Sequence, residues 1–139
     1  MLDIGGDPVG ARLLARFEPN IKAEDYELLY VLNANRPEVR SPEAALRCLR
    51  GIEATTGLTC GGIVNNTHLC GETTAADIRK GAALAAQVSR ETGIPVLCHV
   101  AEERFVQELS DLSEPVFPIS IKMKKPWEIL PAGKRGKEE

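Results

Sequence analysis

The chain has 139 residues, 43% of them hydrophobic, with 17 Lys and Arg against 20 Asp and Glu and a formal net charge of -3. This length and composition suit one globular domain, and the slightly acidic balance gives no reason to expect nucleic acid as a partner. No stretch approaches the ~18 apolar residues of a membrane span and no secretory leader is visible, so we expect a cytoplasmic protein with reduced cysteines.

Segments typical of strands and of helices alternate along the first 121 residues. Continuous apolar runs of strand length favour buried parallel strands, and apolar residues at i, i+3, i+4 and i+7 favour helices. In chain order the predicted elements are a strand end at Met1-Leu2, a short helix over 10–17, a strand over 26–33, a helix over 42–56, a strand over 58–66, a helix over 74–92, a strand over 95–100, a helix over 102–112 and an edge strand over 116–121.

The two longest predicted helices carry end signals of their own. Ser41 is a good N-cap, and Gly57 ends the helix that follows it. Thr74 with Asp77 three residues later forms a capping box, and Gly93 stops the second helix. These local signals fix both helices from the sequence alone.

The alternation predicts an α/β fold with a mostly parallel sheet flanked by helices and right-handed crossovers. Residues 1–121 form one domain, and residues 122–139 form a basic tail containing Pro and Gly, whose composition favours a solvated end over a binding tail. Ligands bind past the carboxyl ends of parallel strands. Three such ends carry polar residues, at 3–7, 33–36 and 65–68, and we expect them to converge.

The segment 3–7 has the residue types of a phosphate and magnesium site. Asp3 at a strand end can hold Mg²⁺ directly or through water. Gly6, with Gly5 beside it, allows a backbone N–H to approach a terminal phosphate, and Asp7 is placed to orient an attacking water. A strand followed by a Gly-Asp turn explains the same residues equally well.

Two further strand ends offer binding groups. Asn65 and Asn66 carry donors and acceptors that can read the edge of a purine base. A turn-forming Asn pair is the favoured interpretation of that motif alone. Arg36 could face a phosphate, but a structural role is favoured for it as well.

A metal or redox site is the weakest hypothesis from the residues. His68, Cys70, Cys98 and His99 lack the spacing of a zinc site. Cys48, Cys60 and Cys98 fall in predicted core segments, where cysteine packs as a small hydrophobe. Only His68 and Cys70 could pair in a loop.

The runs LDIGGDPVGARLLARF at 2–17, YELLYVLNANRPEVRSPEAALRCLRGIEATTGL at 26–58, GGIVNNTHL at 61–69 and ETTAADIRKG at 72–81 resemble the C-terminal half of the MinD/ParA-like ATPases of the CobQ/CobB/MinD/ParA group. The resemblance covers residues 1–121 and implies a P-loop NTPase-like three-layer fold that binds ATP and Mg²⁺ and works as a dimer. By the same resemblance, Asp3 matches the Mg²⁺-associated aspartate and Gly6 the γ-phosphate-sensing glycine. Asn65 matches the adenine-recognising asparagine, with Asn66 as the nearby alternative.

The chain departs from this family in one large respect. Neither G-x-x-x-x-G-K-[ST] nor its deviant form with an extra lysine occurs in the sequence. The resemblance therefore implies an ATPase fragment that is inactive alone and needs a homodimer partner or a missing N-terminal half. Because half a sheet would leave apolar strand surface exposed, we expect the chain to associate with itself or a partner, or to be poorly soluble. A compact, stable monomer in light scattering would contradict that expectation.

Two other classes of function remain open. The chain could be a non-catalytic, flavodoxin-like binding or interaction module, which would be a folded monomer indifferent to ATP and Mg²⁺. It could also be a metal or redox protein using His68, Cys70 and Cys98, which would hold a stoichiometric metal after purification.

Overall fold

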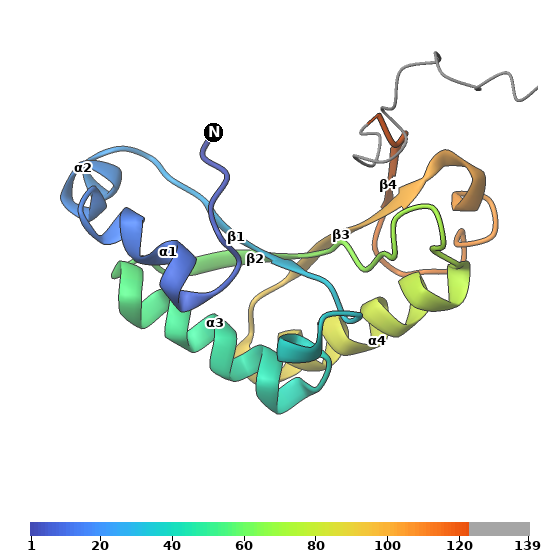
Figure 1. Cartoon of the computed structure of the whole chain (residues 1–139), viewed down its shortest axis with the longest axis horizontal. Helices are drawn as coiled ribbons and strands as arrows, with labels where there is room; N and C mark the ends of the chain where they lie inside the picture. The colour runs from blue at the N-terminus through green and yellow to red at the C-terminus, as the bar shows by residue number, and fades with distance from the viewer. Residues whose placement is uncertain (123–139) are drawn as a thin grey trace, which may run out of the picture.

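Four parallel strands form the centre of this molecule, in a computed structural model that describes residues 1–122 (Figure 1). The basic tail predicted over 122–139 lies outside the described residues from 123 onward. Each strand is hydrogen-bonded to the next one along the chain, in the order β1-β2-β3-β4. The predicted α/β fold with a parallel sheet flanked by helices is confirmed. The strands are β1 (Leu28–Leu32), β2 (Cys60–Asn65), β3 (Val96–Glu102) and β4 (Val116–Ile119).

Two long helices connect the first three strands, α3 (Pro42–Thr56) and α4 (Ala75–Thr92). A short 3-10 helix, η1 (Pro37–Val39), precedes α3. Within residues 1–122, no helix combines the length and apolar character needed to cross a membrane. The predicted caps are confirmed at both helices: Ser41 and left-handed Gly57 bound α3, and the Thr74 and Asp77 capping box and left-handed Gly93 bound α4.

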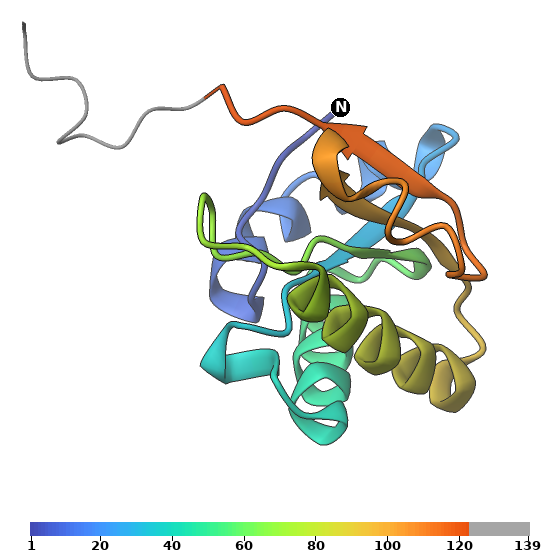
Figure 2. The ribbon, with the colours of Figure 1, turned by 90° about the vertical axis from the view of Figure 1, so that its right-hand side faces the viewer.

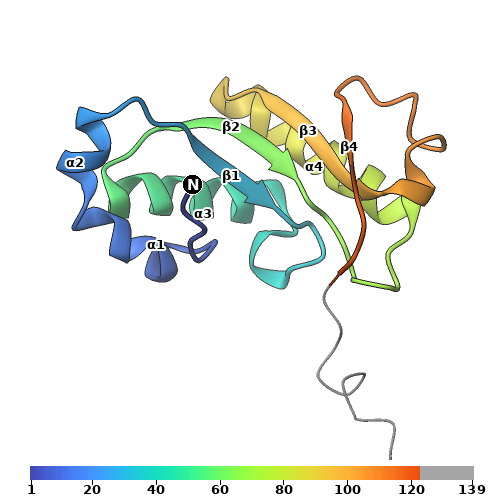
Figure 3. The ribbon, with the colours of Figure 1, turned by 90° about the horizontal axis from the view of Figure 1, so that it is seen from above.

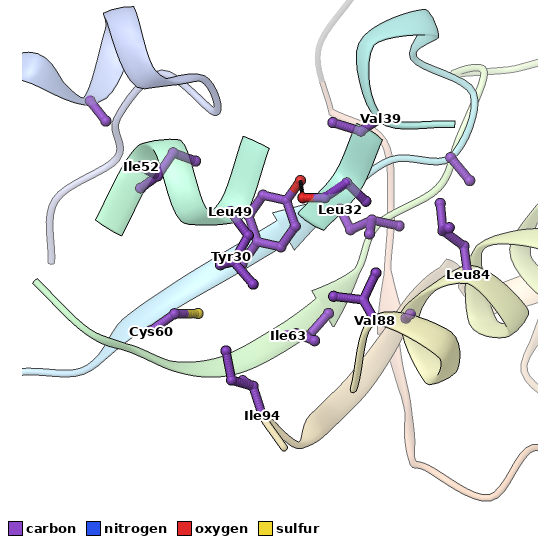
Figure 4. Close-up of a cluster of buried hydrophobic side chains, with 14 residues drawn as sticks. Tyr30, Leu32, Val39, Leu49, Ile52, Cys60, Ile63, Leu84, Val88 and Ile94 are labelled. Carbon is purple, nitrogen blue, oxygen red and sulfur yellow. Dashed lines mark hydrogen bonds between the residues drawn. The ribbon is translucent and has the colours of Figure 1, made fainter. Parts of the chain in front are cut away.

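Both long helices cover the same face of the sheet (Figures 1 and 3). Parallel crossovers are right-handed, and strands laid down in sequence order place successive right-handed crossovers on one side. Tyr30, Leu32 and Ile63 point from the strands into this covered face, where they pack with Leu49 of α3 and Val88 of α4 (Figure 4). The main hydrophobic core therefore lies between one face of the sheet and one layer of helices. The view turned by 90° shows these two layers (Figure 2).

The opposite face of the sheet, which we call the open face, carries no helix (Figure 3). Side chains of Leu29, Val31 and Phe117 are 40%, 54% and 60% exposed there. This confirms the expectation that apolar strand surface is left exposed, although all-parallel sheets are normally buried on both faces. By strand register and alternation, the open face comprises Leu29, Val31, Val64, Cys98, Val100, Phe117 and Ile119.

The N-terminal segment joins the helix layer. Two short helices, α1 (Pro8–Ala15) and α2 (Glu18–Ala23), precede β1, and α1 packs along α3. A Cβ added at Gly51 of α3 would lie 2.7 Å from the Pro8 ring. The predicted strand end at Met1-Leu2 is wrong, because these exposed residues have no neighbouring strand to pair with.

The connection between β3 and β4 also differs from the prediction. Instead of a helix over 102–112, the chain forms a 3-10 helix, η2 (Glu103–Phe105), followed by turns with i to i+3 hydrogen bonds. Arg79 of α4 donates to the Glu108 carbonyl at 2.8 Å and binds both carboxylate oxygens of Asp111. This hydrogen bonding lowers the pKa of Asp111 and ties the connection to α4.

Candidate functional site

The carboxyl edge of the sheet brings together the loops that follow β1 and β2. Asn33 accepts a hydrogen bond from the His68 N–H at 3.3 Å and donates to the His68 carbonyl at 3.4 Å. The Thr67 hydroxyl accepts from the Ala34 N–H at 3.0 Å. The predicted convergence is therefore confirmed for two of the three polar strand ends, 33–36 and 65–68.

Asn65 lies beneath this edge, with none of its side chain exposed. Its Nδ2 donates to the Ile78 carbonyl at 3.0 Å and lies 3.1 Å from His99 Nδ1. Its Oδ1 accepts from the Thr67 N–H at 3.2 Å and from the Thr67 hydroxyl at 2.8 Å. A Cβ at Gly81 of α4 would collide with Asn65 and Thr67, so α4 packs tightly over this amide. Every polar group of Asn65 is used inside the protein, and no part of it faces solvent.

The hydrogen-bonded chain continues through His99 on β3. Because an amide nitrogen can only donate, Nδ1 of His99 accepts from Asn65, which leaves the proton on Nε2. His99 Nε2 lies 3.1 Å from Glu114 Oε2, and the ring is only 1% exposed. One signal for this network is visible in the sequence, because polar Asn65 and His99 interrupt apolar strand segments. The structure pairs the two residues in register.

A pocket of about 170 Å³ opens at the carboxyl ends of β2 and β3. Asn66, Thr67 and His68 line one side. Apolar Val100 of β3 and Ile119 of β4 line another, together with Ile121. The Asn66 backbone N–H donates to the Leu32 carbonyl at 2.8 Å, which fixes the main chain while the half-buried side chain stays at the pocket. Of the two predicted base-reading residues, only Asn66 lines this pocket.

The segment 3–7 is held elsewhere, against the helix layer. Asp7 Oδ1 accepts from the Gly10 N–H at 2.8 Å and so caps α1. The Gly6 carbonyl accepts from the Cys48 thiol at 3.4 Å, and a Cβ added at Gly5 would lie 2.7 Å from the Gly10 Cα. Asp3 is exposed, and none of Asp3, Gly5, Gly6 or Asp7 lines the pocket. The third polar strand end therefore has none of the hydrogen bonds that join the other two, and none of its residues lines the pocket.

Arg36 and its neighbour Asn35 border the same edge. The Arg36 side chain is exposed, while its backbone N–H closes a turn onto the Asn33 carbonyl. Asn35 donates to Asp77 at 3.1 Å and accepts from Lys80 at 3.0 Å. These contacts tie the loop after β1 to the start of α4 and account for both residues without a ligand.

The cysteines and histidines do not assemble into a cluster. Within the described residues there is no group of three or more His, Cys, Asp or Glu side chains that could hold a metal. His68 Nδ1 lies 3.9 Å from Cys70 Sγ and already accepts from the Cys70 N–H. Cys98 belongs to the open face, opposite His99, and burial raises the pKa of its thiol as it does for Cys48 and Cys60.

Comparison with known proteins adds no relative. No family model, no curated protein and no solved structure matches this chain.

Proposed function

We propose that this chain binds the base of an adenine nucleotide in the pocket at the carboxyl ends of β2 and β3, as the part of a MinD/ParA-like ATPase that lacks the phosphate loop. One observation carries the proposal: the side chain of Asn66 lines a largely apolar pocket at the carboxyl edge of a parallel sheet. Ligands bind at this edge in open α/β sheets.

The lining of the pocket suits a flat heterocycle. Val100, Ile119 and Ile121 offer apolar contact for the faces of a ring. The Asn66 amide offers one donor and one acceptor, which complements the amino group and ring nitrogen of adenine. Asn65, which the resemblance assigns to the base, acts in this proposal as a positioning residue, because its amide holds the main chain of the neighbouring loop through Thr67.

The phosphates and Mg²⁺ need groups beyond these. Mg²⁺ takes several hard oxygen ligands, and the Asp7 carboxylate is already committed to the cap of α1. Asp3 by itself supplies too few ligands, so the residues present do not form a magnesium site in this arrangement. A phosphate loop from a separate N-terminal half or from a dimer partner has to complete the site. The chain alone is then expected to bind ATP weakly and not to hydrolyse it.

Amide chemical shifts of the isotope-labelled full chain test the proposal. Titration with adenosine and with ATP should shift the signals of Asn66, His68 and Val100, with or without Mg²⁺, and GTP should produce much smaller shifts. Asn66→Ala should abolish the shifts at Val100. Asn35→Ala, a matched change at the same edge but outside the pocket, should leave them intact. If adenosine and ATP shift nothing, or if Asn66→Ala binds as the parent chain does, the proposal fails.

A non-catalytic binding or interaction module is the second candidate. The structural use of Asn65 and Asp7 favours it, because the ATPase resemblance assigns Asn65 to the adenine base and the residues of 3–7 suggested Asp7 for the attacking water, whereas both side chains are used inside the protein. A folded chain whose spectrum is unchanged by ATP and Mg²⁺ would favour this module over the nucleotide-binding fragment.

A further inference from the structure

The two edges of the sheet differ in how well they are protected against pairing with another chain. β1 and β4 are the edge strands. The Pro115 carbonyl accepts from β3, so alternation along β4 turns the backbone groups of Val116 and Pro118 outward. Pro118 has no N–H to offer there, which weakens this edge as a template. β1, with the sequence LLYVL, contains neither a proline nor a charged residue and lacks that protection.

The free edge of β1 presents backbone groups at two residues. The Leu32 carbonyl accepts from the Asn66 N–H at 2.8 Å, so alternation turns the backbone groups of Leu29 and Val31 away from β2. Within residues 1–122, no loop or side chain supplies a hydrogen-bond partner for these groups. Residues 1–5 form neither a strand nor a hydrogen bond with β1, so pairing at this edge breaks no bond. Such an edge can accept a further strand.

Two copies of β1 fit each other as an antiparallel pair with a two-fold axis at Tyr30. In that register, Leu29 lies opposite the partner's Val31, and the same pairing recurs on the other side of the axis. Because both residues turn their backbone groups outward, each exchanges two N–H···O=C bonds with the residue opposite. Their side chains, 40% and 54% exposed in the single chain, lie side by side on the open face and cover part of each other.

The charges that flank β1 favour the antiparallel orientation over the parallel one. Between positions 24 and 36 the charged residues are Glu24, Asp25 and Glu27 before the strand and Arg36 after it, and all are exposed. In an antiparallel pair, the acidic start of each strand lies beside the end of the other strand, which Asn33 and Arg36 follow. In a parallel pair, the acidic segments of both copies would lie together and repel each other.

We propose that a second copy of this chain pairs with the free edge of β1, antiparallel and centred on Tyr30, so that the two sheets become one. The inference does not depend on the nucleotide pocket, because no residue of β1 lines that pocket. It also differs from a dimer that stacks two open faces, because Phe117 on β4 stays exposed in the edge-paired dimer.

Light scattering and amide hydrogen exchange of the isotope-labelled full chain test the pairing. The chain should be a dimer, and dilution to the monomer should speed the exchange of the Leu29 and Val31 amides at least about tenfold. Val31→Pro removes one outward N–H from each copy, a change that an edge strand tolerates. It should raise the dissociation constant about 25-fold, at about fivefold for each of the two lost hydrogen bonds.

Phe117→Lys is the matched control, since it changes an exposed apolar residue of the other edge strand and should dimerise as the parent chain does. Should circular dichroism show that Val31→Pro is unfolded, Arg36→Glu replaces it. That change places an acid beside the partner's acidic segment and should raise the dissociation constant several-fold at low salt and less at high salt.

Three results would overturn the proposal. The first is a parent chain that is monomeric, or a dimer whose Leu29 and Val31 amides exchange as fast as those of the monomer. The second is a dimer that Phe117→Lys dissociates, which would assign the contact to the open faces. The third is a folded Val31→Pro or Arg36→Glu variant that dimerises as tightly as the parent chain at low salt.

Discussion

The two faces of this sheet carry similar apolar side chains, but helices cover one face and the other face is exposed. Leu32 and Leu29 both belong to β1, yet Leu32 is fully buried under the helices and Leu29 is 40% exposed on the open face. Strand composition cannot explain this difference in burial, because the residues of β1, LLYVL, are apolar or aromatic on both faces of the sheet. The difference comes from the hand of the crossovers, which places both long helices on one side.

The matched leucines of β1 give the largest test of this comparison. Leu32→Ala should lower the free energy of unfolding by about 3–4 kcal/mol, because it leaves a cavity in a packed core. Leu29→Ala should lower it by about 1 kcal/mol, since part of its surface stays in contact with solvent. Chemical denaturation of both variants measures the two losses, and equal losses would show that the open face is as tightly packed as the covered one.

The buried amide of the covered face provides the next test. Asn65→Ala should cost about 3 kcal/mol of unfolding free energy, because it leaves the Ile78 carbonyl and the Thr67 groups without their buried partner. Asn35→Ala removes an amide whose partners Asp77 and Lys80 can turn to water, so its cost should stay below about 1 kcal/mol. Similar values for the two variants in denaturant titrations would contradict the structural role assigned to Asn65.

The smallest predicted effect concerns the start of α4, which supports the covered face. Hydrogen bonds from the Thr74 N–H and hydroxyl hold the pKa of Asp77 below its usual range. A lowered folded-state pKa stabilises the protein above the unfolded pKa, and this contribution is lost as the pH falls through the folded value. Asp77→Asn should therefore cost about 0.5 kcal/mol at neutral pH and progressively less in acid.

The pH dependence of unfolding, measured for the parent chain and for Asp77→Asn, checks this prediction. Glu72→Gln removes an exposed acid just before the cap and is the control. Its difference in unfolding free energy from the parent chain should not become smaller as the pH falls. A stability difference between the parent chain and Asp77→Asn that stays constant in acid would rule out the assigned cap.

Local features of the fold could be predicted from the sequence, and long-range ones could not. The ends of α3 and α4 follow from Ser41, Gly57 and the Thr74–Asp77 box, because each cap is made by residues within one turn of the helix. The order of strands, and with it the open face, depends on pairings between distant segments. The helix expected over 102–112 was wrong, and the contacts that hold this segment come from a distant element, because Arg79 of α4 binds the Glu108 carbonyl and the Asp111 carboxylate.

In the candidate site, too, the sequence could not predict the contacts that single residues make with distant parts of the chain. An asparagine at a strand end suits a purine edge and a buried hydrogen-bond network equally well, so sequence alone could not assign Asn65 and Asn66. The structure separates them, because one side chain is enclosed by Ile78, Thr67 and His99 and the other lines the pocket. Asp7 followed by Pro8 is a local capping signal for α1, whereas the packing of α1 against α3, which positions the whole segment, is encoded by no local motif.

The sequential strand order also has a consequence for how the chain folds. Every strand pairs with the strand that precedes it along the chain, so the sheet can grow from β1 in the direction of synthesis. The pairing of β1 with β2 across α3 requires no residue of β3 or β4, and each later strand needs the closure of only one more loop. In the doubly wound order 3-2-1-4-5-6 the fourth strand returns to the far side of the first strand, whereas each new strand of this chain pairs with the strand just before it.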